Sequence, residues 1–98
     1  MIYHITTNTA WQAALLKGYY ETESLFAEGF IHNSSLQQVA GVLDRYYKNA
    51  TDLILLHIDE SKLTFPLKYE LAPSVNELFP HIFGPINTDA VVEVKTIQ

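Results

Sequence analysis

The alternation of apolar and polar positions divides the chain into short strands and amphipathic helices. Residues 2–6 form a β-branched and aromatic run, which predicts a strand. Trp11, Ala14 and Leu15 then recur at helical spacing, and Gly18 follows as a helix stop. The first part of the chain is therefore predicted to be a strand followed by a short helix over residues 9–17.

A second strand and a second helix follow. Residues 22–27 are compatible with one helical turn, and residues 30–33 have the composition of a short strand. Ser34 or Ser35 can cap the clearest helix in the sequence, which should end near Asn49. One face of that helix is apolar and carries Leu36, Val39, Ala40, Leu43 and Tyr47.

The rest of the chain is predicted to be mainly strand. Residues 52–59 contain the continuous apolar run Leu53–Leu56, as expected for a central strand covered on both faces. Residues 67–71 alternate like a half-exposed strand, and residues 90–97 form a last strand. Between these two, residues 78–85 combine large apolar side chains with two prolines and a glycine, which predicts an apolar loop.

These elements predict one small α+β domain over residues 1–98, with a mixed, mainly antiparallel sheet and packed helices. The chain is 48% apolar and 17% charged, too apolar for disorder and too interrupted for a membrane span. Its net charge is −5 and Arg45 is its one arginine, which argues against duplex nucleic acid as a partner. The sequence leaves the oligomeric state open.

The absence of cysteine excludes disulfides, thiolate metal sites and a cysteine nucleophile. The first residues show no basic region followed by a long apolar stretch, so no signal peptide is expected and the predicted location is the cytoplasm.

Three histidines stand in otherwise apolar segments and carry the candidate chemistry. His4 and His32 lie in the first two predicted strands, and His81 lies in the predicted apolar loop. Each could be a hydrogen-bonded structural histidine, a general acid or base, a hydrogen-bond donor to sugar hydroxyls, or a metal ligand. His57, at the end of the central strand, is interpreted as structural.

Other chemistries have weaker signals. The long, irregular histidine spacings lack the close pairs typical of zinc sites, so no metal is assigned. Ser34 lies outside any nucleophile elbow, and no glycine-rich phosphate loop occurs. Glu70, on a predicted strand, is either a base or ribose-orienting carboxylate, or a solvated strand residue.

The segments taken together resemble a bacterial family, domain of unknown function 952. The resemblance rests on an ordered set of motifs from Ile2 to about Val92: the strand around His4 with Trp11 and Ala14 after it, Gly18-Tyr19, Ser24-Leu25, Glu28 to Ser34, and Phe79 to Pro85. Asn33 and Phe83 depart from the family, where cysteine and tyrosine are common at these positions.

That family is grouped with the ADP-ribosyltransferase-like folds, so the resemblance implies a cleft for an NAD-type nucleotide. Carried over by position, His4 would bind the adenosine ribose, and His32 with Ser34 would line the nicotinamide-ribose side. Glu70 or His81 would occupy the side of the cleft that the third sequence motif of those folds lines. The resemblance thus implies His4, His32, Ser34 and Glu70 as catalytic residues, and as ligand contacts it implies Tyr3, Thr6, Asn33, Ser35 and His81.

Three functional hypotheses remain open at this stage. The first is an ADP-ribosyltransferase-like or NAD- or nucleotide-handling enzyme that uses the histidine-lined cleft, and the second is a non-catalytic binding domain for a nucleotide or other small ligand. The third is a metal-dependent hydrolase built on the histidines. The first two motifs of this chain also resemble those of the RNA 2′-phosphotransferases, which hold a 2′-phosphate with several arginines. Arg45 is the one arginine of this chain, which argues against that reaction.

Overall fold

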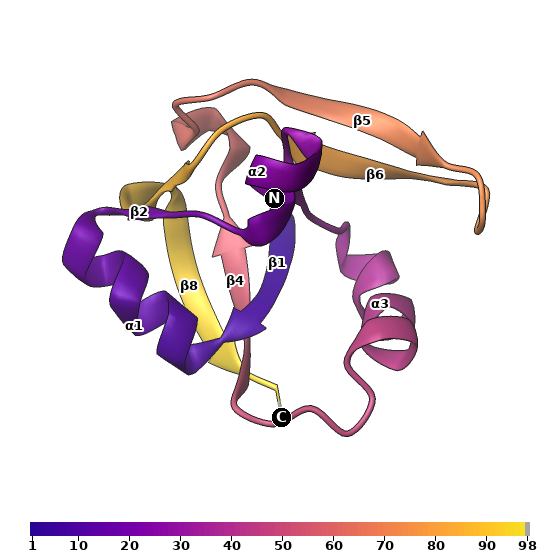
Figure 1. Ribbon diagram of the computed structural model, residues 1–98, viewed down its shortest axis with the longest axis horizontal. Coiled ribbons are helices and arrows are strands. Elements are labelled where there is room, and N and C mark those ends of the chain that lie inside the picture. The colour runs from indigo at the N-terminus through magenta and orange to yellow at the C-terminus, as the bar shows by residue number, and fades with distance from the viewer. Residues whose placement is uncertain (98) are drawn as a thin grey trace.

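The computed structural model describes residues 1–97 and has an α+β architecture of short elements (Figure 1). The helices and strands have these bounds: β1 Ile2–Thr7, α1 Asn8–Lys17, β2 Tyr19–Tyr20, α2 Glu23–Glu28, β3 Ile31–His32, α3 Val39–Tyr46, β4 Leu53–Ile58, β5 Leu67–Ala72, β6 Glu77–Ile82, β7 Ile86–Asn87 and β8 Val91–Thr96. Short 3-10 turns precede α3, follow β4 and precede β8. None of the described helices is long and apolar enough to cross a membrane.

The strands form three small antiparallel sheets, whereas the sequence predicts one mixed sheet. Their orders are β1-β4-β8, β2-β7 and β3-β6-β5, and every pairing within them is antiparallel. Within residues 1–97, one isolated backbone bridge, Tyr3 to Ser34, connects the first and third sheets. The short two-residue strands explain the difference, because they are too brief to extend one ladder across the molecule.

Strand β4 is the central strand of its sheet, as its continuous apolar run predicts. One face carries Ile54, Leu56 and Ile58 into a cluster with Trp11 of α1. The other face carries Leu53 and Leu55 into a second cluster that includes Val39 of α3. Figure 1 shows α1 and α3 on either side of β1 and β4. Burial of both faces accounts for the lack of alternation in this strand.

Helix boundaries follow their capping residues. Thr7 accepts a hydrogen bond from the Ala10 N–H at the start of α1, and Gly18 ends that helix in the left-handed region, at a φ of 90°. Ser35 forms a capping box with Gln38 ahead of α3, as one of the two predicted caps. The predicted helix is divided here into a 3-10 turn and α3, and it ends at Tyr46, three residues before the predicted end at Asn49.

The prediction of an apolar loop over residues 78–85 is wrong, because residues 77–82 form strand β6. Pro80 is tolerated there for a geometric reason. Its carbonyl accepts a hydrogen bond from the Asn33 N–H, 3.0 Å away, so the side on which its own N–H is missing faces β3. Strand β3 ends at His32, so the hydrogen bond that Pro80 cannot donate to the Asn33 carbonyl falls at the very end of this ladder. His81 therefore lies on a strand and not in a loop.

Gly84 lies directly under the Phe65 side chain, which makes it sensitive to substitution. A Cβ atom at this position would overlap Phe65 Cγ and would be 2.7 Å from Phe65 Cβ. Gly84→Ala is therefore expected to destabilise the protein by about 1–3 kcal/mol, measured from denaturant unfolding curves. Combining it with Phe65→Gly, which also removes the Phe65 Cβ, should relieve the clash, so that the double variant is about as stable as Phe65→Gly alone.

Gly41→Ala in α3 is the matched control for this prediction. A Cβ there meets only the flexible end of Arg45, at 3.0 Å, and alanine is the better helix former. Equal effects of the two substitutions would contradict the assigned clash.

Candidate functional site

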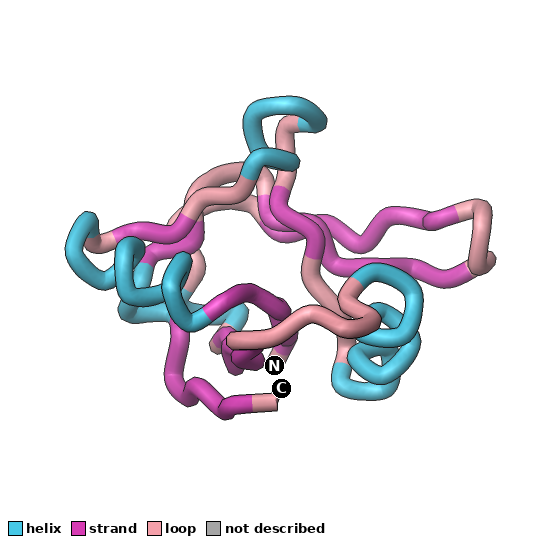
Figure 2. Tube along the Cα trace, turned by 60° about the horizontal axis from the view of Figure 1, so that its bottom comes forward, coloured by secondary structure: helices cyan, strands magenta, loops and turns pink. Residues whose placement is uncertain are grey.

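A cleft of about 1000 Å³ lies beside β1, between α3 and the β5–β6 hairpin. Two of its walls come from β1 and from the segment that follows β3, which the Tyr3–Ser34 bridge joins. Figure 2 shows α3 and the hairpin on the same side of the molecule. The cleft collects these predicted site residues: His4, Thr6, His32, Asn33, Ser34 and His81.

His4 is buried and both of its ring nitrogens are engaged. Nδ1 lies 2.7 Å from the His32 carbonyl, which can only accept, so Nδ1 carries the proton. Nε2 lies 2.8 Å from the Tyr20 hydroxyl, which also lies 2.8 Å from Thr6 Oγ1. Burial lowers the pKa of His4 to about 4, so the ring is neutral at pH 7. His4 therefore connects β1 to β3 through the His32 carbonyl.

Tyr20 was not identified from the sequence, and it completes this buried group. Burial raises the pKa of its hydroxyl to about 12, so it stays protonated. The hydroxyl lies between His4 Nε2 and Thr6 Oγ1, 2.8 Å from each, and it ties both side chains of β1 to β2. A tyrosine after the helix stop at Gly18 carries no signal of its own, since only the fold brings it to His4.

His81 lines the cleft and forms a hydrogen bond with Glu70, which is not among the residues that line it. Nδ1 of His81 lies 2.7 Å from Glu70 Oε1, and the His81 side chain is largely buried whereas that of Glu70 is 45% exposed. The pair forms because Lys68 is directly opposite His81 in the β5–β6 register, which puts Glu70 at the diagonal position on the same face. A carboxylate that holds Nδ1–H leaves Nε2 with a lone pair for proton transfer.

A second imidazole and carboxylate stand next to the first. His32 is directly opposite His81 in the register, and their ring centroids are 5.2 Å apart. Its Nε2 lies 3.0 Å from Glu28 Oε2 at the end of α2, and both side chains are about half exposed. Phe30 stacks on His81, with ring centroids 4.0 Å apart and planes 12° from parallel. This packing fixes the orientation of the His81 ring.

The remaining predicted residues have different positions. Ser34 is buried and exchanges two backbone hydrogen bonds of 2.8 Å with Tyr3. The Tyr3 ring packs on His57, 4.9 Å between centroids. Ser35 caps the turn before α3. Asn33 is 3% exposed, and its side-chain nitrogen donates to the Ile31 carbonyl. These contacts give Tyr3, Ser34 and Ser35 roles in holding the walls of the cleft.

The cleft also contains residues without a sequence signal. Arg45, at the end of α3, is the one arginine of the chain and lines the cleft. The aromatic residues Tyr46, Tyr47 and Phe79 line the same cleft. The Tyr46 side chain is 70% exposed, and the Arg45 guanidinium stands over its ring, 5.8 Å from the centroid. The sequence pattern predicts Tyr47 on the apolar face of its helix. Burial raises the pKa of its hydroxyl. Among the described residues, no group of three or more histidines or carboxylates is arranged to hold a metal ion.

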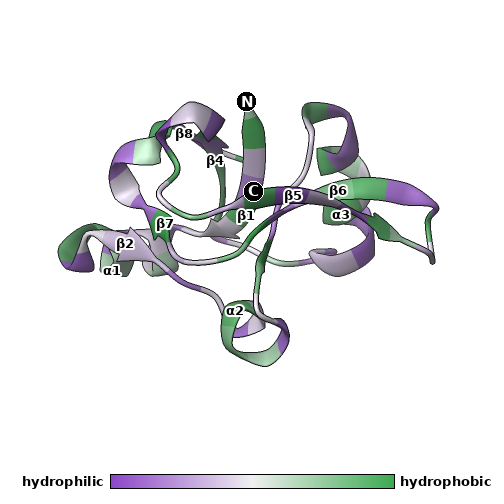
Figure 3. Cartoon of the chain, turned by 90° about the horizontal axis from the view of Figure 1, so that it is seen from above, coloured by the Kyte–Doolittle hydropathy of each residue, from purple (hydrophilic) through white to green (hydrophobic). Residues whose placement is uncertain are grey.

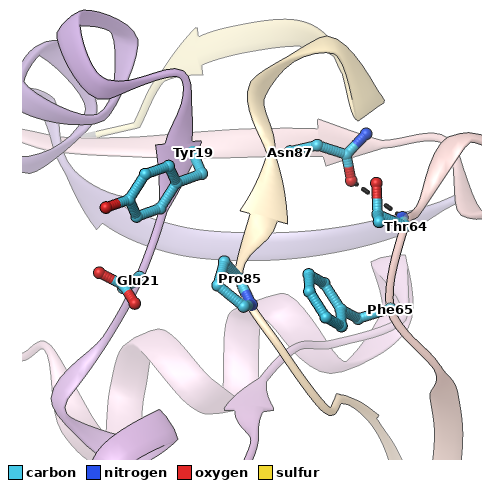
Figure 4. Close-up of a pocket in the computed structure, with 6 residues that line it drawn as sticks. All are labelled: Tyr19, Glu21, Thr64, Phe65, Pro85 and Asn87. Atoms are coloured by element: carbon cyan, nitrogen blue, oxygen red, sulfur yellow. Dashed lines mark hydrogen bonds between the residues drawn. The ribbon is translucent and has the colours of Figure 1, made fainter.

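A smaller pocket of about 400 Å³ lies elsewhere on the molecule (Figure 4). Figure 4 shows the rings of Tyr19, Pro85 and Phe65 along it, with Glu21 at one end. The Asn87 side chain is already committed to the fold, because its oxygen accepts from the Thr64 N–H at 3.0 Å. This pocket offers ring surfaces and few free polar atoms, so the larger cleft is the candidate site.

The family model described as "Protein of unknown function (DUF952)" matches residues 5–94. Two solved structures of protein CC0527 from Caulobacter crescentus have the same fold as this chain. Its crystal structure is 28% identical with a TM-score of 0.89, covering 99% of this chain and 85% of that chain. Its solution NMR structure is 28% identical with a TM-score of 0.84, covering 99% and 84%. No curated protein matches the chain.

Proposed function

Because this chain belongs to the DUF952 family, whose function is unknown, we propose a function from the chemistry of its own cleft. The proposal is a nucleotide-handling enzyme, ADP-ribosyltransferase-like in its reaction, that binds an NAD-type ligand and uses His81 for proton transfer. The observation that carries it is the 2.7 Å hydrogen bond from Nδ1 of His81, which lines the cleft, to Glu70, which lies behind it and outside the lining.

The size and lining of the cleft suit such a ligand. Small-molecule sites enclose about 300–1000 Å³, and this cleft is at the upper end of that range. Tyr46 and Phe79 offer ring surfaces for a base, and Arg45 offers a cation for a diphosphate. The hydroxyl of Ser24 adds a polar group among them.

The proposed step is group transfer at the ribose. The bond between ribose C1′ and the nicotinamide nitrogen breaks, and nicotinamide leaves with the bonding electrons. A bond forms from C1′ to the oxygen of water or another hydroxyl acceptor, and His81 Nε2 takes the acceptor proton. Glu70 stabilises the imidazolium that results, since it already accepts from Nδ1–H.

The alternative is a non-catalytic domain that binds a nucleotide or another small ligand in the same cleft. The contacts of His4 favour it, because both ring nitrogens are used inside the fold. In this alternative the histidines shape and hold the cleft, and no proton is transferred.

Binding of NAD is tested by titrating the protein with NAD and following backbone amide signals by NMR. We expect saturable shifts at Ser34, Arg45 and His81, with Tyr19 and Phe65 of the smaller pocket as internal controls. Arg45→Gln should weaken binding by about 10- to 100-fold through loss of a charge-assisted hydrogen bond, and Arg45→Lys by less. Absence of shifts at millimolar NAD would remove NAD as the ligand. Binding without release of nicotinamide would favour the non-catalytic alternative.

A further inference from the structure

We propose that the free edge of β5 pairs with β5 of a second copy of this chain, antiparallel and centred on Tyr69. This inference concerns assembly and goes beyond the proposed function. Strand β5 is the outer strand in the order β3-β6-β5, and it is six residues long and mostly exposed. Figure 2 shows the β5–β6 hairpin extending away from the rest of the chain. A long exposed edge of this kind is a template for pairing with another strand.

The register of the hairpin fixes which backbone groups face the free edge. The Pro80 carbonyl accepts from Asn33, and the Leu78 carbonyl accepts from Gln38 Nε2 at 2.8 Å, so both point away from β5. Tyr69 is directly opposite Pro80, and this is then a pair without mutual hydrogen bonds. The N–H and C=O of Tyr69 consequently point outward.

The same alternation applies two residues away on either side of Tyr69. The backbone N–H and C=O groups of Leu67 and Leu71 also face the free edge. None of the described residues supplies a partner for these groups. Strand β5 thus presents the N–H and C=O groups of three alternate residues, Leu67, Tyr69 and Leu71, to an incoming strand.

The sequence of β5 is complementary to itself about Tyr69. A two-fold axis at Tyr69 places Lys68 opposite Glu70 of the second copy, and Glu70 opposite Lys68 of the second copy. It also places Leu67 opposite Leu71 of the second copy. Opposite charges and apolar side chains directly across an antiparallel pair are both favourable. This self-complementarity identifies a second copy, and not an unrelated strand, as the occupant.

The exposed apolar side chains of the hairpin support the same partner. Tyr69 is 52% exposed, Leu71 is 55% exposed, and Leu78 is 57% exposed. Leu78 is directly opposite Leu71, so the three side chains share one face. Figure 3 shows hydrophobic and hydrophilic positions along this hairpin. The two-fold arrangement would bring two such apolar groups together in one continuous sheet.

The opposite face of the paired strands would reach the cleft. Lys68 and Glu70 lie on the face that carries His81, and Glu70 accepts from His81 Nδ1. Lys68 of the second copy would then stand next to the Glu70–His81 pair. Assembly would in this way add a positive charge beside the carboxylate of each site.

The test is sedimentation equilibrium of the full chain over a concentration series reaching millimolar. We expect a reversible monomer–dimer equilibrium. Tyr69→Pro removes the central outward N–H and should abolish the dimer, whereas Tyr69→Phe keeps the N–H and the ring and should preserve it. A wild-type chain that stays monomeric, or a dimer unaffected by Tyr69→Pro, would overturn the proposal.

A charge exchange keeps the test decisive if the proline variant does not fold. Lys68→Glu and Glu70→Lys should each raise the dimer dissociation constant at least tenfold, because like charges then face each other. Mixing the two variants should restore association. The heterodimer should have a dissociation constant at least tenfold lower than that of either variant homodimer. Failure of the mixture to associate would refute pairing about Tyr69. The readout is molecular mass without nucleotide, so it stands or fails independently of NAD binding.

Discussion

His81→Ala is expected to slow the release of nicotinamide from NAD by about 10²- to 10⁴-fold while NAD still binds. The substitution removes Nε2, the proposed proton acceptor, and leaves the other cleft walls in place. Glu70→Gln should have a smaller effect, since an amide oxygen can still accept from Nδ1–H but no longer stabilises the imidazolium by charge. Nicotinamide release under single-turnover conditions measures this effect.

The control for this prediction is Tyr19→Phe, in the smaller pocket, which should leave the rate unchanged. Circular dichroism checks that the His81 variant keeps its fold after losing the contact with Phe30. Wild-type rates in His81→Ala, with NAD bound, would rule out His81 as the proton acceptor.

Stability is expected to fall by about 3 kcal/mol as the pH drops from 6.5 towards 4, through His4 alone. The pKa of His4 is lowered in the folded protein, mainly by burial, from 6.5 to about 4. Between these values the unfolded chain binds more protons than the folded one, so stability rises with pH. The contribution is complete above pH 6.5 and is lost as the pH falls through about 4.

Urea unfolding at several pH values measures this contribution. His4→Gln should remove the part of the pH dependence that arises between pH 4 and 6.5, although the variant is less stable at pH 7. His57→Gln provides a comparison from the neighbouring strand β4. An unchanged pH profile in His4→Gln would show that His4 is not the titrating group.

Much of the strand pattern could be predicted because apolar periodicity reports burial directly. Residues 53–58 are the central strand, as predicted, since both of their faces are covered. Strand β6 could not be predicted in the same way, because Pro80 normally excludes a residue from a paired strand. Its tolerance depends on β3 ending at His32, which is a property of the tertiary structure.

The candidate site could be predicted in part. His4, His32 and His81 all line the cleft, because β3 is adjacent to β6 and His4 reaches the His32 carbonyl. The pairing of Glu70 with His81 depends on the β5–β6 register. The sequence predicts a loop where β6 lies, so this register could not be predicted. Neither Tyr20 nor Arg45 carries a local signal for a binding site, so only the fold identifies them as cleft residues.

The order of the strands in the β1-β4-β8 sheet also affects how the chain folds. Strand β1 pairs with β4, about fifty residues later, and β4 pairs in turn with β8. These ladders join distant segments, and such contacts form slowly because long loops must close first. During synthesis β4 therefore stays unpaired on one edge until β8 has left the ribosome, which makes its apolar run the segment most dependent on protection from aggregation.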